Sequence, residues 1–229
     1  MASEQEESEA TRLSRWQVKW KANQTNWHVD GVHRALEKHK PTMAEGTRVL
    51  FPLCGKSVDM EILANQGCDV VGVDGCPEAL AAFVSDRKAT IASEKKQLST
   101  VNLQSSRSIG FFVGAFIGLT PGDTGGSFDF AFDRGSLVAI TPDDRPAYAS
   151  TLSSLVTGTL LLVCVEHGPF FGGKLGPPFS IAHADVESLF GESFSVELLE
   201  REDRMQIEPV WKERGCEQFD ETTYLLKRR

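Results

Sequence analysis

The sequence predicts an α/β fold with a mainly parallel sheet that helices cover on both faces. Several short runs resemble strands, and most are continuous Val, Leu and Phe segments, which is typical of strands buried on both faces. Amphipathic stretches lie between several of these runs, as expected where helices connect parallel strands. The predicted strands are residues 49–53, 70–73, 111–113, 128–132, 159–166, 195–199 and 223–227.

The size and charge of the chain predict a globular protein whose main partner is neither nucleic acid nor an anionic membrane. A chain of 229 residues is long enough for a large core, and at this length folding buries roughly 70% of the unfolded surface. Its 24 basic and 32 acidic side chains give a net charge of −8, which disfavours nucleic acid and anionic membranes as partners. We expect a monomer.

The cysteines and the N-terminus predict a cytoplasmic protein. The five cysteines show neither a CxxC pair nor the spacing of zinc ligands, so we expect reduced thiols and no metal site. Residues 1–10 are acidic and polar, unlike a signal peptide. The longest apolar run, residues 160–165, is too short to span a bilayer.

The N-terminal region combines a predicted disordered tail, residues 1–11, with the beginning of a single domain over residues 12–229. Two amphipathic helices without a preceding strand are expected to open this domain. Their apolar positions are Leu13, Trp16 and Trp20 in the first helix and Val29, Val32 and Leu36 in the second.

Further helices are expected between the strands. Pro77 predicts the beginning of one of them, because proline is favoured at the first helical position. The polar residues 87–108 show no clear period and receive no assignment. The other expected helices are residues 57–66, residues 142–156 and a short segment that contains Val186, Leu189 and Phe190.

Polar or glycine-containing segments follow three predicted strands, at residues 52–56, 74–75 and 133–135. Ligands bind beyond the carboxyl ends of the strands in an open α/β sheet, so these segments are candidates for a binding site. Asp74 lies 19 residues after Gly55, close to the interval of ~20 residues at which an acidic side chain meets a bound ribose. A carboxylate can accept hydrogen bonds from both ribose hydroxyls.

The first of these segments distinguishes between nucleotides. Gly55 is its one glycine, and it forms neither a Gly-x-Gly-x-x-Gly turn nor a Walker-type phosphate loop. A dinucleotide needs such bare backbone against its pyrophosphate, whereas S-adenosylmethionine carries adenosine and no phosphate. The sequence therefore favours S-adenosylmethionine over NAD or FAD.

Each of these features also has a purely structural interpretation. Gly55 could form an ordinary turn, Asp74 could cap a helix, and Asp133 could pair with Arg134 at a strand end. Ser136 does not stand in a Gly-x-Ser-x-Gly motif, so a hydrolase is not supported. The histidines of the N-terminal region are expected to be solvated: His28, His33 and His39.

Five motifs resemble, in order, those of the thiopurine S-methyltransferase family. They are WQVKW at 16–20, FPLCGK at 51–56, VVGVD at 70–74, DRGSLVAI at 133–140 and GPPF at 176–179. The resemblance implies a Rossmann-like, seven-stranded methyltransferase fold. It also implies S-adenosyl-L-methionine as methyl donor and transfer of its methyl group to the sulfur of aromatic and heterocyclic thiols, including thiopurines.

The resemblance further implies the residues of the site. The helix with Trp16 and Trp20 becomes a lid over the donor instead of a plain core element, and Trp27 stands where the family has an aromatic residue against the substrate. Gly55 turns the backbone under the donor. The implied donor contacts are Trp16, Trp20, Leu53, Gly55, Asp74, Ala115, Phe116 and Arg134.

The sequence departs from the family pattern in three places. Asp74 is one methylene shorter than the glutamate often found there, and residues 114–118 lack the acidic residue common after the third strand. Residues 208–211 stand about where some members present an arginine on the substrate side.

These residues are compatible with a one-step methyl transfer. An aromatic thiol is largely a thiolate near neutrality, and Arg134 would favour that anion by charge pairing. Asp133 would either hold the Arg134 guanidinium or accept a proton from less acidic thiols. Trp27 and Phe179 could sandwich a flat substrate ring.

Other functions are open at this point. The methyl acceptor could be a halide or an inorganic selenium or tellurium species, as in related methyltransferases. The chain could also bind the donor without turnover. A nicotinamide enzyme is disfavoured, because the first loop has one glycine.

Overall fold

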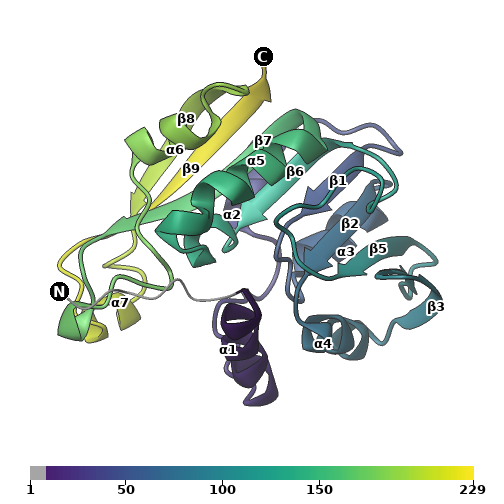
Figure 1. Cartoon of the computed structure of the whole chain (residues 1–229), viewed down its shortest axis with the longest axis horizontal. Helices are drawn as coiled ribbons and strands as arrows, with labels where there is room; N and C mark the ends of the chain where they lie inside the picture. The colour runs from purple at the N-terminus through teal and green to yellow at the C-terminus, as the bar shows by residue number, and fades with distance from the viewer. Residues whose placement is uncertain (1–8) are drawn as a thin grey trace.

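The computed structural model describes residues 9–229, and their strands form one nine-stranded sheet (Figure 1). The strand order is β3-β4-β5-β2-β1-β6-β7-β9-β8. The strands are β1 Arg48–Phe51, β2 Asp69–Asp74, β3 Thr90–Lys95, β4 Leu98–Asn102, β5 Ser108–Val113, β6 Phe128–Arg134, β7 Val156–His167, β8 Phe194–Asp203 and β9 Phe219–Arg228.

Helices connect and cover these strands. The α-helices are α1 Glu9–Lys21, α2 Arg34–His39, α3 Val58–Asn65, α4 Pro77–Arg87, α5 Arg145–Leu155, α6 His183–Phe190 and α7 Val210–Glu213. The short 3-10 helices are η1 Leu137–Ala139, η2 Pro142–Asp144 and η3 Phe171–Gly173.

The centre of the sheet is parallel, and its strand order reverses between β1 and β6. β1 pairs in parallel with β2 on one side and with β6 on the other, so the chain leaves β1 for one half of the sheet and enters the other half at β6. The carboxyl ends of β1 and β6 are therefore neighbours, which is where an α/β sheet of this kind binds ligands.

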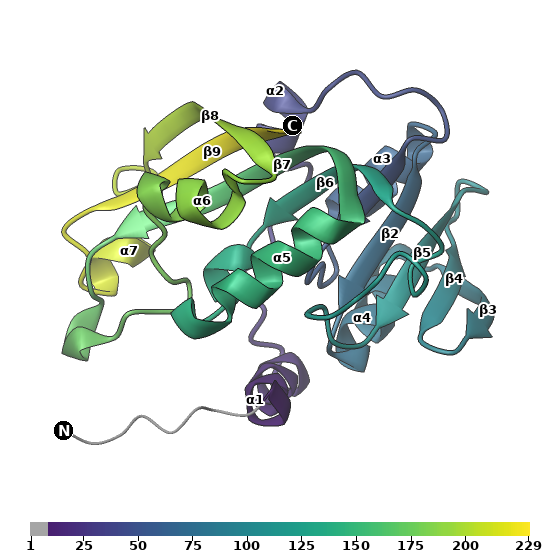
Figure 2. The same ribbon diagram turned by 45° about the horizontal axis from the view of Figure 1, so that its top comes forward.

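Helices lie on both faces of the sheet (Figure 2), and an apolar cluster fills the space on each face. One contains Tyr148 and Leu152 of α5 and Phe190 of α6. The other contains Leu36 of α2, Leu63 of α3 and residues of α4. The expected coverage of both faces is present because the strands carry apolar side chains in both directions.

The sheet has nine strands, so the expected count of seven is wrong. Each of the seven predicted runs overlaps a strand, although the first, 49–53, extends two residues beyond β1. The two additional strands, β3 and β4, form an antiparallel hairpin within the unassigned residues 87–108. Every residue of β3 is exposed, so this edge strand carries no apolar pattern. At the other edge, β9 and β8 are both antiparallel to their neighbours.

The N-terminal helices differ from their expected bounds. α1 begins at Glu9, so the last residues of the predicted tail are helical, and residues 1–8 lie outside the described part of the chain. α2 begins only at Arg34, after Gly31 with a φ of 87° has turned the backbone. In residues 9–229 no helix combines the length and apolar character that a membrane span requires.

Candidate functional site

A cavity lies at the carboxyl ends of β1 and β6, where the strand order reverses. Its walls come from the turn after β1, from the end of β6 and from the segment between α1 and α2. The lining residues are Trp27, His28, Val29, Phe51, Pro52, Leu53, Cys54, Ser57, Asp59, Phe132, Arg134 and Gly135. This is the position that the sequence indicated for a ligand.

The turn after β1 is held together by Asp74, the last residue of β2. One carboxylate oxygen, Oδ2, accepts a hydrogen bond from the Gly55 N–H at 2.9 Å, and the other accepts one from the Cys76 N–H at 2.8 Å. Burial raises the pKa of Asp74 to about 6. Each oxygen keeps further acceptor capacity, so the same carboxylate can accept hydrogen bonds from a diol.

Gly55 permits a close approach of another segment. It has a φ of 52°, and a Cβ at this position would come within 2.4 Å of His28 Nε2. The Lys56 N–H donates a hydrogen bond to that nitrogen at 3.1 Å. Leu53, two residues earlier, also has a positive φ, of 40°, which is a sparsely populated conformation that is frequent at binding sites. A side chain at position 55 would fill this cradle.

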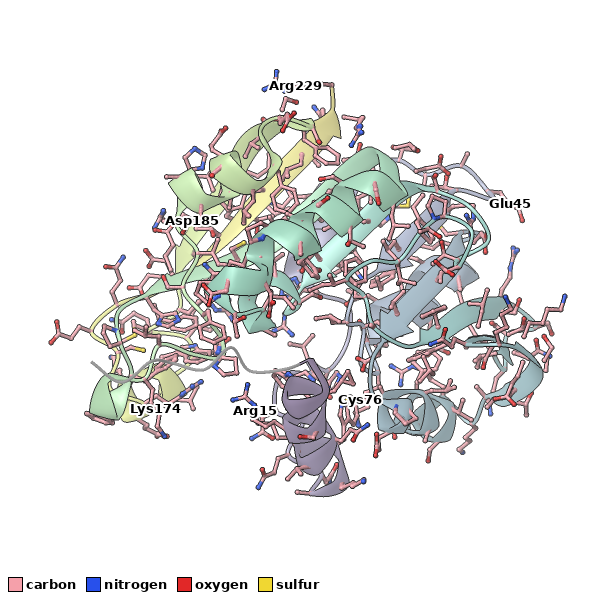
Figure 3. All side chains as sticks on the ribbon, in the orientation of Figure 1. Arg15, Glu45, Cys76, Lys174, Asp185 and Arg229 are labelled. Carbon is pink, nitrogen blue, oxygen red and sulfur yellow. The ribbon has the colours of Figure 1, made fainter. Side chains whose placement is uncertain are left out.

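Three tryptophans cluster beside the turn. Trp27 makes edge-to-face contacts with Trp16 and Trp20, with ring centroids 5.2 Å and 5.8 Å apart. The helix α1 that carries Trp16 and Trp20 rests on the exit of β2, where Gly75 leaves room for the Leu13 side chain. Figure 3 labels Cys76 between α1 and α4. Trp20 and Trp27 also pack on His28, which contacts the Gly55 turn, so the tryptophan cluster lies beside this turn.

Arg134 lies at the end of β6 and lines the cavity. Its Nη1 donates a hydrogen bond to the Trp27 carbonyl oxygen, and burial lowers its pKa. Arg134 remains a cation at neutral pH even so, because the guanidinium pKa is far above 7. The cavity therefore contains a half-buried positive charge beside an indole ring.

Asp133 does not hold the Arg134 guanidinium, which corrects one of the two expected roles. Successive residues of a strand point to opposite faces, so Asp133 is buried on the face that α5 covers. Its carboxylate accepts hydrogen bonds from the Tyr148 hydroxyl at 2.8 Å and from the Leu137 N–H at 3.2 Å. Asp133 is fully buried and absent from the cavity lining, so its position does not suit a proton acceptor for a substrate either.

The remaining predicted residues lie at different depths. Ala115, after β5, is exposed, whereas the neighbouring Phe116 is buried and packs its ring against Tyr148 at 4.8 Å. Phe179 is half-buried, and its N–H donates to the Val138 carbonyl at 2.6 Å. The Phe116 side chain thus belongs to the core, which leaves only its backbone for a donor contact.

The histidines near α2 are less solvated than the sequence suggested. His28 is half-buried on the Gly55 turn, and burial lowers its pKa to about 4. His33 is buried against Phe132, and burial lowers its pKa to about 3. The His33 N–H donates to Asp59 Oδ1 at 2.8 Å.

Sequence reasoning missed some of the lining. His28 and Asp59 come from segments far apart in the sequence, and only the fold brings them together. The polar residues Ser57 and Asp59 at the beginning of α3 were the one feature of the sequence that could have indicated this part of the lining. No group of three or more His, Cys, Asp or Glu side chains in residues 9–229 could hold a metal ion.

Comparison with known proteins identifies the family. The family model described as thiopurine S-methyltransferase (TPMT) matches residues 11–229. The thiopurine S-methyltransferase of Pseudomonas paraeruginosa is 32% identical over 217 residues, which are 93% of this chain and 97% of the relative. The enzyme of the same name from Rattus norvegicus is 32% identical over 232 residues, covering 98% and 95% of the two chains.

Solved structures share the fold at low identity. The 1,6-didemethyltoxoflavin-N1-methyltransferase of Burkholderia thailandensis, solved with S-adenosylhomocysteine, has a TM-score of 0.62 and 17% identity, covering 96% of this chain and 88% of that chain. The magnesium protoporphyrin IX methyltransferase of Synechocystis, also with S-adenosylhomocysteine, has a TM-score of 0.60, 14% identity and coverages of 95% and 100%. This chain therefore belongs to the thiopurine S-methyltransferase family of S-adenosylmethionine-dependent enzymes.

Proposed function

We propose that this enzyme transfers the methyl group of S-adenosylmethionine to the sulfur of aromatic or heterocyclic thiols, thiopurines included. The observation that carries the proposal is the cavity at the reversal of the strand order. It combines the Arg134 guanidinium with the Trp27 ring, next to the turn that Asp74 and Gly55 build.

The donor side of the proposed site is the turn after β1. Asp74 would accept hydrogen bonds from the ribose hydroxyls, since both of its oxygens already face the exit of the sheet through the Gly55 and Cys76 N–H groups. Leu53 and the backbone at Gly55 would lie under the donor. Helix α1 would cover it as a lid through Trp16 and Trp20, which already pack at this exit.

The acceptor side is the space around Arg134. The bound donor supplies an activated methyl group, which the thiolate sulfur takes as the bond to the sulfonium breaks and S-adenosylhomocysteine is released. Arg134 would hold the thiolate by charge pairing. This attraction is effective because Arg134 is half-buried in the cavity, where water screens the two charges little. Trp27 would fix the plane of the substrate ring, and Phe179 would cover it from the loop before α6.

Incubation with labelled S-adenosylmethionine and a panel of acceptors tests this proposal. The panel contains aryl thiols, thiopurines, iodide and selenite, and mass spectrometry identifies the products. We expect methyl thioethers from the thiols. A volatile methylated halide or selenium product in the headspace, with no thioether, would assign the enzyme to a different acceptor. Donor binding without any methylated product would reject turnover altogether.

A further inference from the structure

A second cavity lies between η3 and α7, outside the cavity at the strand reversal. Its volume is about 230 Å³, and its lining comes from the loop after β7 and from the residue that follows α7. The lining residues are Phe170, Phe171, Lys174, Gly176 and Arg214. The exposed fraction of the Phe171 ring is 69%, so the mouth of this cavity presents an aromatic surface to solvent.

A stack of flat side chains continues inward from Phe170, which lines this cavity. Trp211 and Phe219 stack with their ring centroids 3.7 Å apart, and Phe170 continues the array. The Arg214 guanidinium lies over the Phe170 ring, 3.9 Å from its centroid. His167 packs between Phe170 and Phe219. These planes are suited to an aromatic ring, which binds well against aromatic faces and guanidinium groups.

The cavity is also positively charged in a protein whose net charge is −8. Lys174 and Arg214 both line it, and Lys19 of α1 lies within electrostatic range of Arg214. Among the described residues no ion pair involves any of these three cations. Figure 3 shows the labelled Arg15 projecting from α1 toward the side of the molecule that carries Lys174. An anion is the ligand that such a group of cations favours.

Contacts link this cavity to the proposed acceptor site. Arg214 Nη2 donates a hydrogen bond to the Pro177 carbonyl at 3.2 Å, in the same loop that carries Phe179. On the other side, the Lys19 ammonium lies 4.5 Å from the centre of the Trp16 ring, which packs on Trp27. Arg214 of the second cavity thus contacts the loop that carries Phe179, and Lys19, within electrostatic range of Arg214, contacts the tryptophan cluster.

We propose that the cavity at Arg214 and Lys174 binds the anionic substituent of the methyl acceptor, so that the enzyme prefers flat aromatic thiols that carry a carboxylate. This inference rests on the proposed thiol methylation. Arg214 would receive the carboxylate with its planar fork, which matches that group. Lys174, at the mouth of the cavity, would add a positive charge on a flexible side chain, which does not fix the orientation of the carboxylate.

Kinetics with 4-mercaptobenzoate and 4-mercaptobenzamide test the proposal, because these acceptors differ in charge and little in shape. We expect Arg214→Met to raise the KM for 4-mercaptobenzoate, relative to the KM for 4-mercaptobenzamide, about tenfold. This is the effect of losing one charge-assisted hydrogen bond. Lys174→Gln should raise the ratio by a smaller factor of about three, as expected for an exposed charge. Arg214→Lys should retain part of the preference.

Two further measurements keep the result interpretable. Lys95→Gln, on the exposed edge strand β3, is the control and should leave the ratio unchanged. Calorimetry of 4-mercaptobenzoate binding in the presence of S-adenosylhomocysteine shows whether Arg214→Met weakens acceptor affinity directly. An equal rise of both KM values in Arg214→Met, or a wild type that does not distinguish the acceptors, would overturn the inference while leaving thiol methylation intact. Absence of any methylated thiol would instead overturn the proposed function.

Discussion

At the scale of single residues, the site depends on two charged groups at the ends of neighbouring strands. Asp74 and Arg134 are the last residues of β2 and β6, the two strands that flank β1. Asp74 is buried and Arg134 is half-buried. A charge in such surroundings interacts more strongly with its partner than it would at the surface. The two residues are therefore the sharpest tests of donor binding and of acceptor activation.

Substitution of Asp74 should weaken donor binding. Asp74→Asn replaces one acceptor oxygen with an N–H donor that faces the Gly55 or Cys76 N–H, and we expect the affinity for S-adenosylhomocysteine to fall about 10- to 100-fold. Titration calorimetry measures this. The control is Asp69→Asn at the exposed beginning of the same strand. Unchanged affinity in Asp74→Asn would remove this residue from the donor site.

Substitution of Arg134 should act on the acceptor. Arg134→Ala removes the cation that pairs with the thiolate, and we expect kcat/KM to fall about 10- to 100-fold for acidic aryl thiols and less for thiols of higher pKa. Arg134→Lys keeps a charge and should lose less. A plot of kcat/KM against thiol pKa checks this, and equal losses across the whole series would contradict the charge-pairing role.

The position of Asp74 at a strand end could be predicted, because the chain itself carries the signal. Asp74 ends a continuous apolar run, so the sequence places it at the carboxyl end of a strand. The side chain of Asp133 could not be oriented in advance, because the choice between a cavity and Tyr148 depends on where α5 packs. The contact between His28 and the Gly55 turn joins segments that only the folded chain brings together.

At the scale of elements, helix α1 packs on the exit of β2, beside the turn after β1. The contact depends on Gly75, where a Cβ would lie 2.8 Å from the Leu13 side chain, and it is extended by the ion pair of Lys21 with Glu78 at 3.7 Å. This pair is exposed on the lysine side and adds little stability. Apolar packing of Leu13, Trp16 and Trp20 is the main attachment of the helix.

The tryptophan cluster should report donor binding. Three of the four tryptophans lie beside the turn after β1. The fourth, Trp211 of α7, lies in the aromatic stack with Phe219. We expect S-adenosylhomocysteine to change the tryptophan emission, Trp16→Phe in α1 to remove most of that change, and Trp211→Phe to retain it. Saturating binding in the calorimeter without any change in emission would contradict a lid formed by α1.

The elements that the sequence predicted best are the buried parallel strands. Their Val, Leu and Phe runs have a single interpretation in an α/β chain. The β3–β4 hairpin escaped prediction because β3 is exposed along its whole length, so no burial pattern distinguishes it from a loop. Helix α2 is shorter than expected, because Val29 and Val32 precede it in an irregular segment in which Val29 lines the cavity.

At the scale of the whole molecule, stability should depend on pH through His33. Burial lowers the pKa of this imidazole to about 3, below the ordinary value of 6.5. The folded state thus favours neutral His33, and this contribution to stability is present above pH ~6.5 and is lost as the pH falls toward 3. The side chain also accepts the Ala35 N–H at the beginning of α2, so Asn is the appropriate replacement.

Urea unfolding at pH 7 and pH 4.5 measures this effect. We expect the free energy of unfolding to fall by about 2 kcal/mol more in the wild type than in His33→Asn over this interval. The same replacement at the exposed His183 should behave like the wild type. An identical pH dependence in His33→Asn and the wild type would show that folding does not lower the pKa of this histidine.

The imidazole of His28 has a consequence for how quickly the donor can enter. It accepts the Lys56 N–H and fills the space above Gly55, so the chain itself occupies an acceptor position at the turn. An S-adenosylmethionine molecule whose oxygen accepts a hydrogen bond from the Lys56 N–H must first displace His28. The oxygen and His28 Nε2 would then compete for one hydrogen, so such a contact would make binding of S-adenosylmethionine no faster than release of His28 from the Lys56 N–H.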